Sequence, residues 1–124
     1  MDLSAITPST IKVEIKHPGT GAPTGLVIEC ASLESEPVKR VQRAITDKVL
    51  RSRNRKPTAE QIEENAVEVI AAAVVGWEWK DGATWEGGKK LDFSLANVRT
   101  VVSVPWLRQQ LDEALGDEAA FFGN

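Results

Sequence analysis

The chain has 124 residues, a formal net charge of −3 and a single cysteine, Cys30. We expect one domain of residues 1–124, because a chain of this length buries roughly two-thirds of its unfolded surface without help from metals or disulfides. One cysteine excludes an intrachain disulfide and a cysteine-based zinc site. The first ten residues lack the pattern of a secretory signal, and the longest apolar run, residues 69–76, is too short for a bilayer. We therefore expect a cytoplasmic protein.

Residues 9–32 have the pattern of a β-hairpin. Apolar and charged side chains alternate over residues 11–16, which predicts a strand with one buried face. Residues 17–25 contain two prolines and three glycines and are typical of a turn. A returning strand follows over residues 26–31, with an apolar face of Leu26, Ile28 and Cys30. A lone hairpin is marginally stable in water, so we expect helices or another subunit to cover this face.

Two helices are predicted after the hairpin. The first begins at Ser35, followed by Glu36 and Pro37 in the first turn, and has an apolar stripe of Val38, Val41, Ile45 and Val49. Pro57 ends it. The second begins with a capping box at residues 58–61 and continues at helical spacing through Ile62, Ala66, Val69, Ile70, Ala73 and Trp77.

Two shorter helices are predicted near the C-terminus. Ser94 caps the first, whose apolar residues are Leu95, Val98, Val101 and Val102. The second starts around Pro105, ends at Gly116 and has a stripe of Leu107, Leu111 and Leu115. The sequence thus predicts an α+β fold: an N-terminal β-hairpin and a larger helical part of about four helices, residues 35–122.

Charge is distributed unevenly along the chain. Residues 1–56 carry a net charge of +4 and residues 57–124 a net charge of −7, a polarity that favours association of copies or attraction of a charged partner. Within residues 39–56, eight lysines and arginines face only one acidic residue. This basic run is open to three interpretations: a face that docks protein, a stripe that binds nucleic acid phosphates, or a solvated helix surface.

No pattern of catalytic, cofactor-binding or metal-binding residues stands out, so we expect a protein that is not an enzyme. His17 lies in a turn with no second histidine or cysteine nearby, which favours a solvated turn residue. Glu63, Glu64 and Glu68 fall on a polar helix face, where carboxylates are usually solvated. Residues 19–21 lack the Gly-Lys-Ser/Thr ending of a phosphate loop.

The four tryptophans are candidates for contact with a partner. Positions 77 and 79 of a regular helix cannot both face the same core, so we expect either that at least one of them lies outside it or that the helix ends there. We interpret Trp77 and Trp106 as packing residues and Trp79 and Trp85 as exposed aromatic contacts, since tryptophan is enriched at protein interfaces. A carbohydrate platform is a weaker alternative, because no cluster of Asn, Asp and aromatic residues accompanies them.

A short motif in the second half of the chain resembles a known family. A Gly-Trp pair, an Asp-Gly turn and a Phe-Ser-x-x-Asn helix start follow one another at Gly76, Trp77, Asp81, Gly82, Phe93, Ser94 and Asn97. This arrangement resembles the tail assembly chaperones of long-tailed bacteriophages. The resemblance implies a non-enzymatic factor of the host cytoplasm that coats the tape measure protein, recruits tail tube subunits and is lost from the finished particle.

We therefore expect a protein-binding domain that also forms homo-oligomers and does not enter a membrane. Its expected contact residues lie on apolar faces, an aromatic loop, a basic helix face and an apolar C-terminal tail: Leu26, Ile28, Val98, Val102, Trp79, Trp85, Arg40, Arg43, Arg51, Phe121 and Phe122. Two other classes remain open. A structural virion protein, for tail completion or head–tail joining, would share the size and the hairpin, and a small nucleic-acid-binding regulator would use the basic run.

Overall fold

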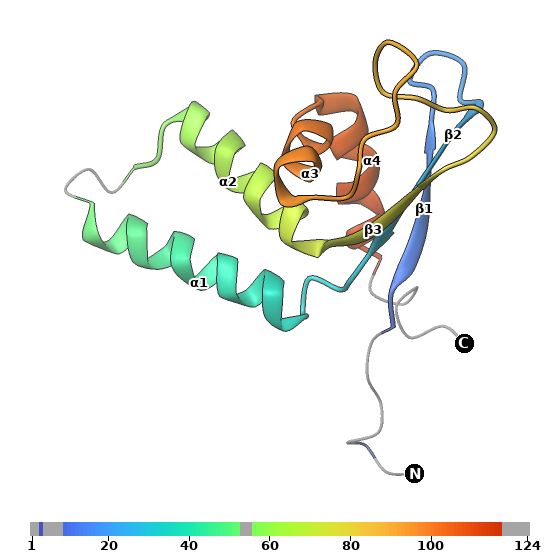
Figure 1. Ribbon diagram of the computed structural model, residues 1–124. Helices are drawn as coiled ribbons and strands as arrows, with labels where there is room; N and C mark the ends of the chain where they lie inside the picture. The colour runs from blue at the N-terminus through green and yellow to red at the C-terminus, as the bar shows by residue number, and fades with distance from the viewer. Residues whose placement is uncertain (1–2, 4–8, 53–55, 118–124) are drawn as a thin grey trace.

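The computed structural model describes residue 3 and residues 9–52 and 56–117. Its elements, in chain order, are β1 (Ile11–Lys16), β2 (Pro23–Cys30), α1 (Glu36–Arg51), α2 (Ala59–Ala73), β3 (Val74–Trp79), α3 (Leu95–Val102) and α4 (Pro105–Leu115). Figure 1 shows α3 and α4 against the sheet, and α1 and α2 as a helical hairpin that extends away from it. The predicted α+β class, with about four helices after an N-terminal β-hairpin, is confirmed.

A third strand, which the sequence pattern did not predict, completes the sheet. The strand order is β1-β2-β3, and both pairings are antiparallel. The prediction that α2 continues to Trp77 is wrong, because α2 ends at Ala73 and β3 starts at Val74 with no residue between them. The last helical residues are alanines, which favour helix, whereas Val74 and Val75 are β-branched and favour a strand. Pairing with the open edge of β2 then decides the conformation.

The core lies between one face of the sheet and the helices. Ile15, Leu26, Ile28 and Cys30 supply the buried residues of the hairpin, so the predicted apolar face of β2 is confirmed. From the helices come Val38, Ile70, Ala71, Ala73, Val98, Val101, Val102, Leu107, Leu111 and Leu115. On the opposite face of the sheet, Val27 lies in register between Glu14 and Glu78, and both glutamates are exposed. One face of the sheet is therefore covered and the other faces solvent.

Helix α4 is tied to β1 by a side chain that acts like a neighbouring strand. The Gln110 side-chain amide donates to the Lys16 carbonyl and accepts from the Lys16 N–H, both at 2.8 Å. These bonds satisfy outward-facing backbone groups of an edge strand that would otherwise be open for pairing. The contact joins residues 94 positions apart and holds the C-terminal helix against the hairpin.

Gly25 tests the contact between the start of β2 and Lys80, the residue that follows β3. Its φ angle is +97°, and its carbonyl accepts a hydrogen bond of 2.7 Å from the Lys80 N–H. A Cβ at this position would lie 2.1 Å from the Lys80 carbonyl oxygen. We therefore expect Gly25→Ala to lower the free energy of unfolding by about 2 kcal/mol or more, through backbone strain and loss of this contact. Chemical denaturation followed by circular dichroism measures the change.

Gly76→Ala is the matched control for this substitution. Gly76 lies in β3, has no positive φ and has open space where a Cβ would stand. Its replacement should change stability by less than about 1 kcal/mol. Equal effects of the two substitutions would show that neither the positive φ of Gly25 nor its close contact with Lys80 requires a glycine there.

Candidate protein-binding surfaces

Four of the expected contact residues belong to the core. The side chains of Leu26, Ile28, Val98 and Val102 are all buried, so in this fold they are not available to a partner. The interpretation of these residues as a contact surface is therefore corrected. An amphipathic pattern shows that a face is apolar but does not show what covers it, and here β2 and α3 cover each other's apolar faces through the shared core.

The tryptophans of β3 form an aromatic cluster with two residues from the loop that follows. We use this term for Trp77, Trp79, Trp85 and Phe93. Their rings meet edge to face, with centroid separations of 5.8 Å for Trp77–Trp79, 5.3 Å for Trp77–Phe93 and 6.5 Å for Trp79–Trp85. Such geometry aligns the positive edge of one ring with the negative face of the next. The Trp77 and Trp79 indole N–H groups both donate to the Leu91 carbonyl, at 3.0 and 3.2 Å.

Of the two alternatives expected for Trp77 and Trp79, the structure has the second: the helix ends before them, at Ala73, and both lie in β3. In a strand, residues two apart point to the same face. Trp77 and Trp79 lie in register with Ile28 and Leu26, on the buried face of the sheet. All three clustered tryptophans are half-buried against the core, whereas Trp106, interpreted as a packing residue, is 38% exposed.

Two tight turns shape the loop that closes over this cluster. Asp81 and Gly82 both have positive φ, and the Ala83 N–H donates to the Lys80 carbonyl at 2.9 Å. Gly87 and Gly88 repeat this geometry, and the Lys89 N–H donates to the Glu86 carbonyl at 3.0 Å. Asp-Gly and Gly-Gly suit such turns because both central residues need left-handed backbone. The loop therefore has a fixed path around Trp85.

The Phe-Ser-x-x-Asn part of the motif ends this loop and starts α3. The Ser94 hydroxyl accepts from the Asn97 N–H at 3.2 Å, which confirms Ser94 as the helix cap. The Asn97 side chain donates to the Asp92 carbonyl at 2.8 Å and so fixes the residues before the helix. Phe93 is 48% exposed and Leu95, two residues later, is 58% exposed. We call Phe93 and Leu95 the exposed rim of the aromatic cluster.

Sequence reasoning did not single out this rim. In the sequence, Phe93 stands out only as part of the motif, and Leu95 only as part of the apolar stripe of the predicted helix. Helical spacing placed Leu95 beside Val98, but Leu95 is the first residue of α3, where the helix has just emerged from the loop. A lone apolar residue beside a cap carries no sequence signal that separates a core position from a surface position.

The predicted basic face of α1 is partly neutralised within the chain. Arg43 pairs with Glu36 at 2.6 Å, and Lys39 pairs with Glu34 at 3.2 Å. Arg40 and Arg51 are exposed. The opposing glutamates precede residue 39, so a count limited to residues 39–56 missed them. Exposed ion pairs of this kind add little stability, but they reduce the positive charge that would attract phosphates.

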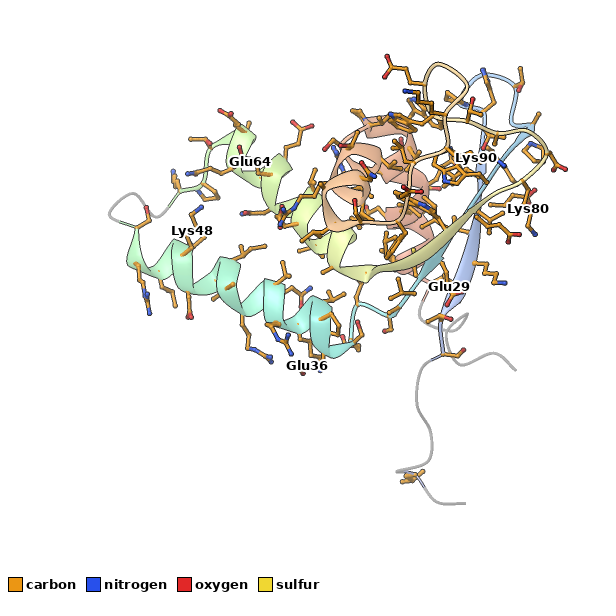
Figure 2. The ribbon with its side chains drawn as sticks, viewed as in Figure 1. Glu29, Glu36, Lys48, Glu64, Lys80 and Lys90 are labelled. Carbon is orange, nitrogen blue, oxygen red and sulfur yellow. The ribbon has the colours of Figure 1, made fainter. Side chains whose placement is uncertain are left out.

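Helices α1 and α2 form what we call the arm. An open groove runs along it, with apolar lining from Ile45 on α1 and from Ile62, Ala66, Val69 and Ile70 on α2, and Asp112 of α4 also lines it. Figure 2 places Lys48 on α1 and Glu64 on α2 toward the same end of the arm, while Lys80 and Lys90 lie on the opposite side of the molecule. The arm and the aromatic cluster are thus separate surfaces.

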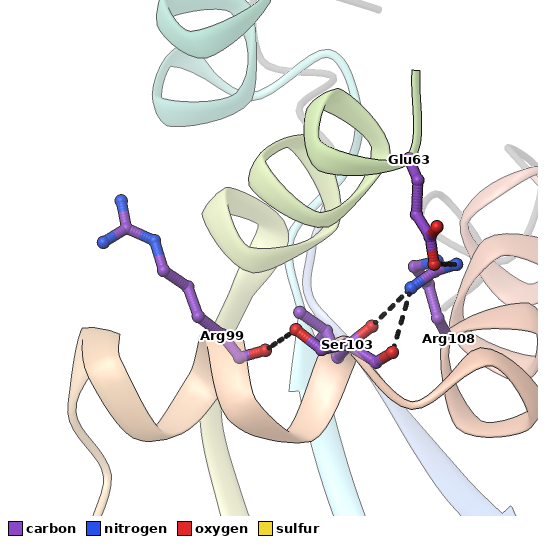
Figure 3. A network of polar contacts seen from close by, with 5 residues as sticks. Glu63, Arg99, Ser103 and Arg108 are labelled. Carbon is purple, nitrogen blue, oxygen red and sulfur yellow. Dashed lines mark hydrogen bonds and ion pairs between the residues drawn. The ribbon is translucent and has the colours of Figure 1, made fainter. Parts of the chain in front are cut away.

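Two of the glutamates weighed as acid–base candidates form ion pairs with the C-terminal helices. Glu68 pairs with Arg99 at 2.8 Å, and Glu63 pairs with Arg108 at 3.4 Å. Arg108 also donates to the carbonyls of Val102 and Ser103, so its cation lies at the C-terminal end of α3 (Figure 3). The two ion pairs join α2 to α3 and to α4.

The other candidate for chemistry, His17, caps its own turn. Its Nδ1 atom accepts from the N–H groups of Gly19 and Thr20, at 3.0 and 3.1 Å. Over the described residues, no group of three or more His, Cys, Asp and Glu side chains is placed to hold a metal ion. None of the helices described here is long and apolar enough to cross a membrane. Phe121 and Phe122 lie outside the described residues.

The chain matches no protein-family model, no curated protein and no solved structure. Its function is therefore argued from the surfaces described above and from the motif.

The buried thiol of Cys30 predicts a specific dependence of stability on pH. Burial, with a smaller contribution from the charge of Glu29, raises the pKa of Cys30 from its ordinary value of 9.0 to about 12. The unfolded chain releases this proton near pH 9, whereas the folded chain keeps it, so folding is favoured below pH 9 and progressively less favoured from pH 9 to about 12. The loss approaches about 1.4 kcal/mol per pH unit.

Cys30→Ala isolates this contribution, because the variant has no thiol to titrate. Denaturation curves should show a wild-type stability advantage that is constant below pH 9 and shrinks above it. Parallel pH profiles for the two proteins would show that the Cys30 thiol ionises at the same pH in the folded and the unfolded chain.

Proposed function

We propose that this chain is a tail assembly chaperone of a long-tailed bacteriophage, a non-enzymatic factor that binds the tape measure protein and tail tube subunits. The observation that carries the proposal is the aromatic cluster with its exposed rim, which shares Trp77 and Phe93 with the motif that gives the chain its resemblance to that family. Gly76 and Trp77 lie in β3, Asp81 and Gly82 form a turn, and Ser94 and Asn97 start α3.

The cluster has the properties of a preformed contact site. Its indoles are held by edge-to-face packing and by two hydrogen bonds to one carbonyl, so little side-chain freedom remains to be lost on binding. Phe93, whose ring contacts Trp77, and Leu95, two residues later in the chain, offer exposed apolar area. Exposed lysines and acids of the same loop, among them Lys89, Lys90 and Asp92, surround it with a polar border, as in many protein interfaces.

An extended helical protein is a suitable partner for such a surface. Helices present apolar side chains at intervals of three and four residues, and these dock against exposed aromatic and aliphatic groups. Partial neutralisation of the basic face by Glu34 and Glu36 favours a protein partner over nucleic acid. As a chaperone, the chain would act in the host cytoplasm and be absent from the mature virion.

Leu95→Gln tests the role of the rim in partner binding. Co-expression with the tape measure protein encoded in the same genome, followed by affinity capture, should recover a complex with the wild-type chain. Leu95→Gln should weaken that complex by roughly tenfold, because it replaces an apolar side chain of the rim with a polar amide. Ile62→Gln, at a position of similar exposure on the arm, should leave capture unchanged.

The location of the protein in a lysate provides an independent check. A chaperone should be found with unassembled tail components and not in purified particles. Recovery of the chain in purified virions, together with failure to capture the tape measure protein, would replace the proposal with a structural virion subunit. A salt-sensitive shift of short DNA duplexes would instead favour the nucleic-acid-binding alternative.

A further inference from the structure

Strand β1 has an open edge. It pairs only with β2, and Figure 1 shows it at the outer edge of the sheet, on the side away from α1 and α2. The Lys16 N–H and carbonyl point out of the sheet, because both bond to Gln110, whereas the Ile15 carbonyl accepts a hydrogen bond from β2. Backbone groups alternate in direction along a strand, so those of Lys12 and Glu14 also point outward.

The pairing of β2 with β3 gives the same directions independently. The Lys80 N–H donates to the Gly25 carbonyl, so the odd-numbered residues of β2 direct their backbone groups to β3. Ile28 therefore directs its groups to β1, where its partner in register is Val13. The two residues on either side of Val13 direct theirs outward.

These outward groups are available for pairing. Among the described residues, the backbone of Lys12 and Glu14 makes no hydrogen bond to any element beyond the hairpin, and neither side chain forms an ion pair. Both side chains are exposed. Unpaired N–H and carbonyl groups along an edge are a template for another strand, and Gln110 already uses those of Lys16 in this way.

An open groove lies between this edge and α4. Its apolar lining comes from Ile11, Val13 and Ala114, and its charged lining from Glu14, Lys16, Glu113 and Asp117. Three carboxylates against one lysine favour an incoming strand of net positive charge. The strand β1 itself carries two lysines and one glutamate, so a second copy of β1 has the required sign.

We infer that β1 pairs with β1 of a second copy, antiparallel about a two-fold axis at Val13. Three registers bring the outward groups together: Lys12 opposite Lys12, Glu14 opposite Glu14, or Lys12 opposite Glu14. The first two place like charges directly opposite each other, which destabilises a strand pair. The third places a lysine opposite a glutamate on both sides of the axis, as a two-fold interface requires. The charges therefore select the third register.

The apolar residues fit the same register. Val13 lies opposite Val13, and Ile11 opposite Ile15, on the face of the sheet that α4 covers. The segment from Ile11 to Ile15 is thus complementary to itself on both faces. The pairing ends at Lys16, because its counterpart would be residue 10, which precedes β1, and because Gln110 occupies the edge there.

Sedimentation equilibrium of the full chain with charge variants tests the inference. The wild-type chain should form a concentration-dependent dimer. Lys12→Glu and Glu14→Lys each oppose like charges on both sides of the axis, so each should weaken the dimer by roughly tenfold. An equimolar mixture of the two variants, and the double variant Lys12→Glu/Glu14→Lys, should dimerise like the wild type, because a lysine again faces a glutamate at both places.

Glu78→Lys is the matched control for Glu14→Lys. Glu78 is exposed on the same face of the sheet, but it lies on β3, with Val27 of β2 between it and Glu14 in register. The substitution makes the same change of charge and should leave the dimer unchanged. Circular dichroism checks that every variant is folded. A wild-type chain that stays monomeric, or equal weakening by Glu14→Lys and Glu78→Lys, would overturn the inference; the first result would leave the edge to a strand of another protein.

Cross-linking locates the two-fold axis. In a non-hydrogen-bonded pair the Cα atoms are about 4.5 Å apart, within the range of a disulfide, so Val13→Cys should give a cross-linked dimer under mild oxidation. Lys12→Cys should not, because its counterpart in the second copy lies two positions along the edge. The native thiol of Cys30 is fully buried and does not compete. Cross-linking of Lys12→Cys but not of Val13→Cys would overturn the proposed register.

The inference concerns self-association at β1 and does not rest on the tail-assembly role. A monomeric chain that captures the tape measure protein would remove the inference and retain the proposed function. A dimer with the expected response to the charge variants that captures no tail component would do the reverse.

Discussion

The pairing of β3 with the open edge of β2 is the constraint on which the rest of the structure depends. Because β3 follows α2 without a connecting residue, its place in the sheet fixes where α2 leaves the body and in which direction the arm extends. The same pairing sets Trp77 and Trp79 opposite Ile28 and Leu26, on the covered face of the sheet. One set of backbone hydrogen bonds thus positions both the aromatic cluster and the arm.

The molecule separates two surfaces of different chemistry. The aromatic cluster is rigid and compact, with rings fixed by mutual contact and by the Leu91 carbonyl. The arm is longer and has an open groove with an apolar lining from both of its helices. Aromatic anchors with a polar border suit a distinct protein partner.

Local chemistry made much of the fold predictable. The β-hairpin followed from period-two alternation and an excess of turn residues, and α2 began where the capping box of Thr58 and Gln61 placed it. Ser94 and Pro105 likewise marked the starts of α3 and α4. These signals are reliable because a cap, a turn or an amphipathic stripe depends on interactions between residues close together in the sequence. Their contribution to the free energy of folding therefore depends little on the rest of the chain.

The sequence by itself determined that the chain is an α+β domain with an apolar hairpin face and a tryptophan-rich loop, and it determined where the helices begin. Only the tertiary structure decided that residues 74–79 form a strand, because the strand is stabilised by pairing with β2, which is distant in the sequence. It also decided which apolar residues are covered: Val98 is buried, while Leu95 and Ile62, with equally apolar side chains, are exposed. Periodicity states which residues share a face, but coverage of that face depends on contacts between elements far apart in the chain.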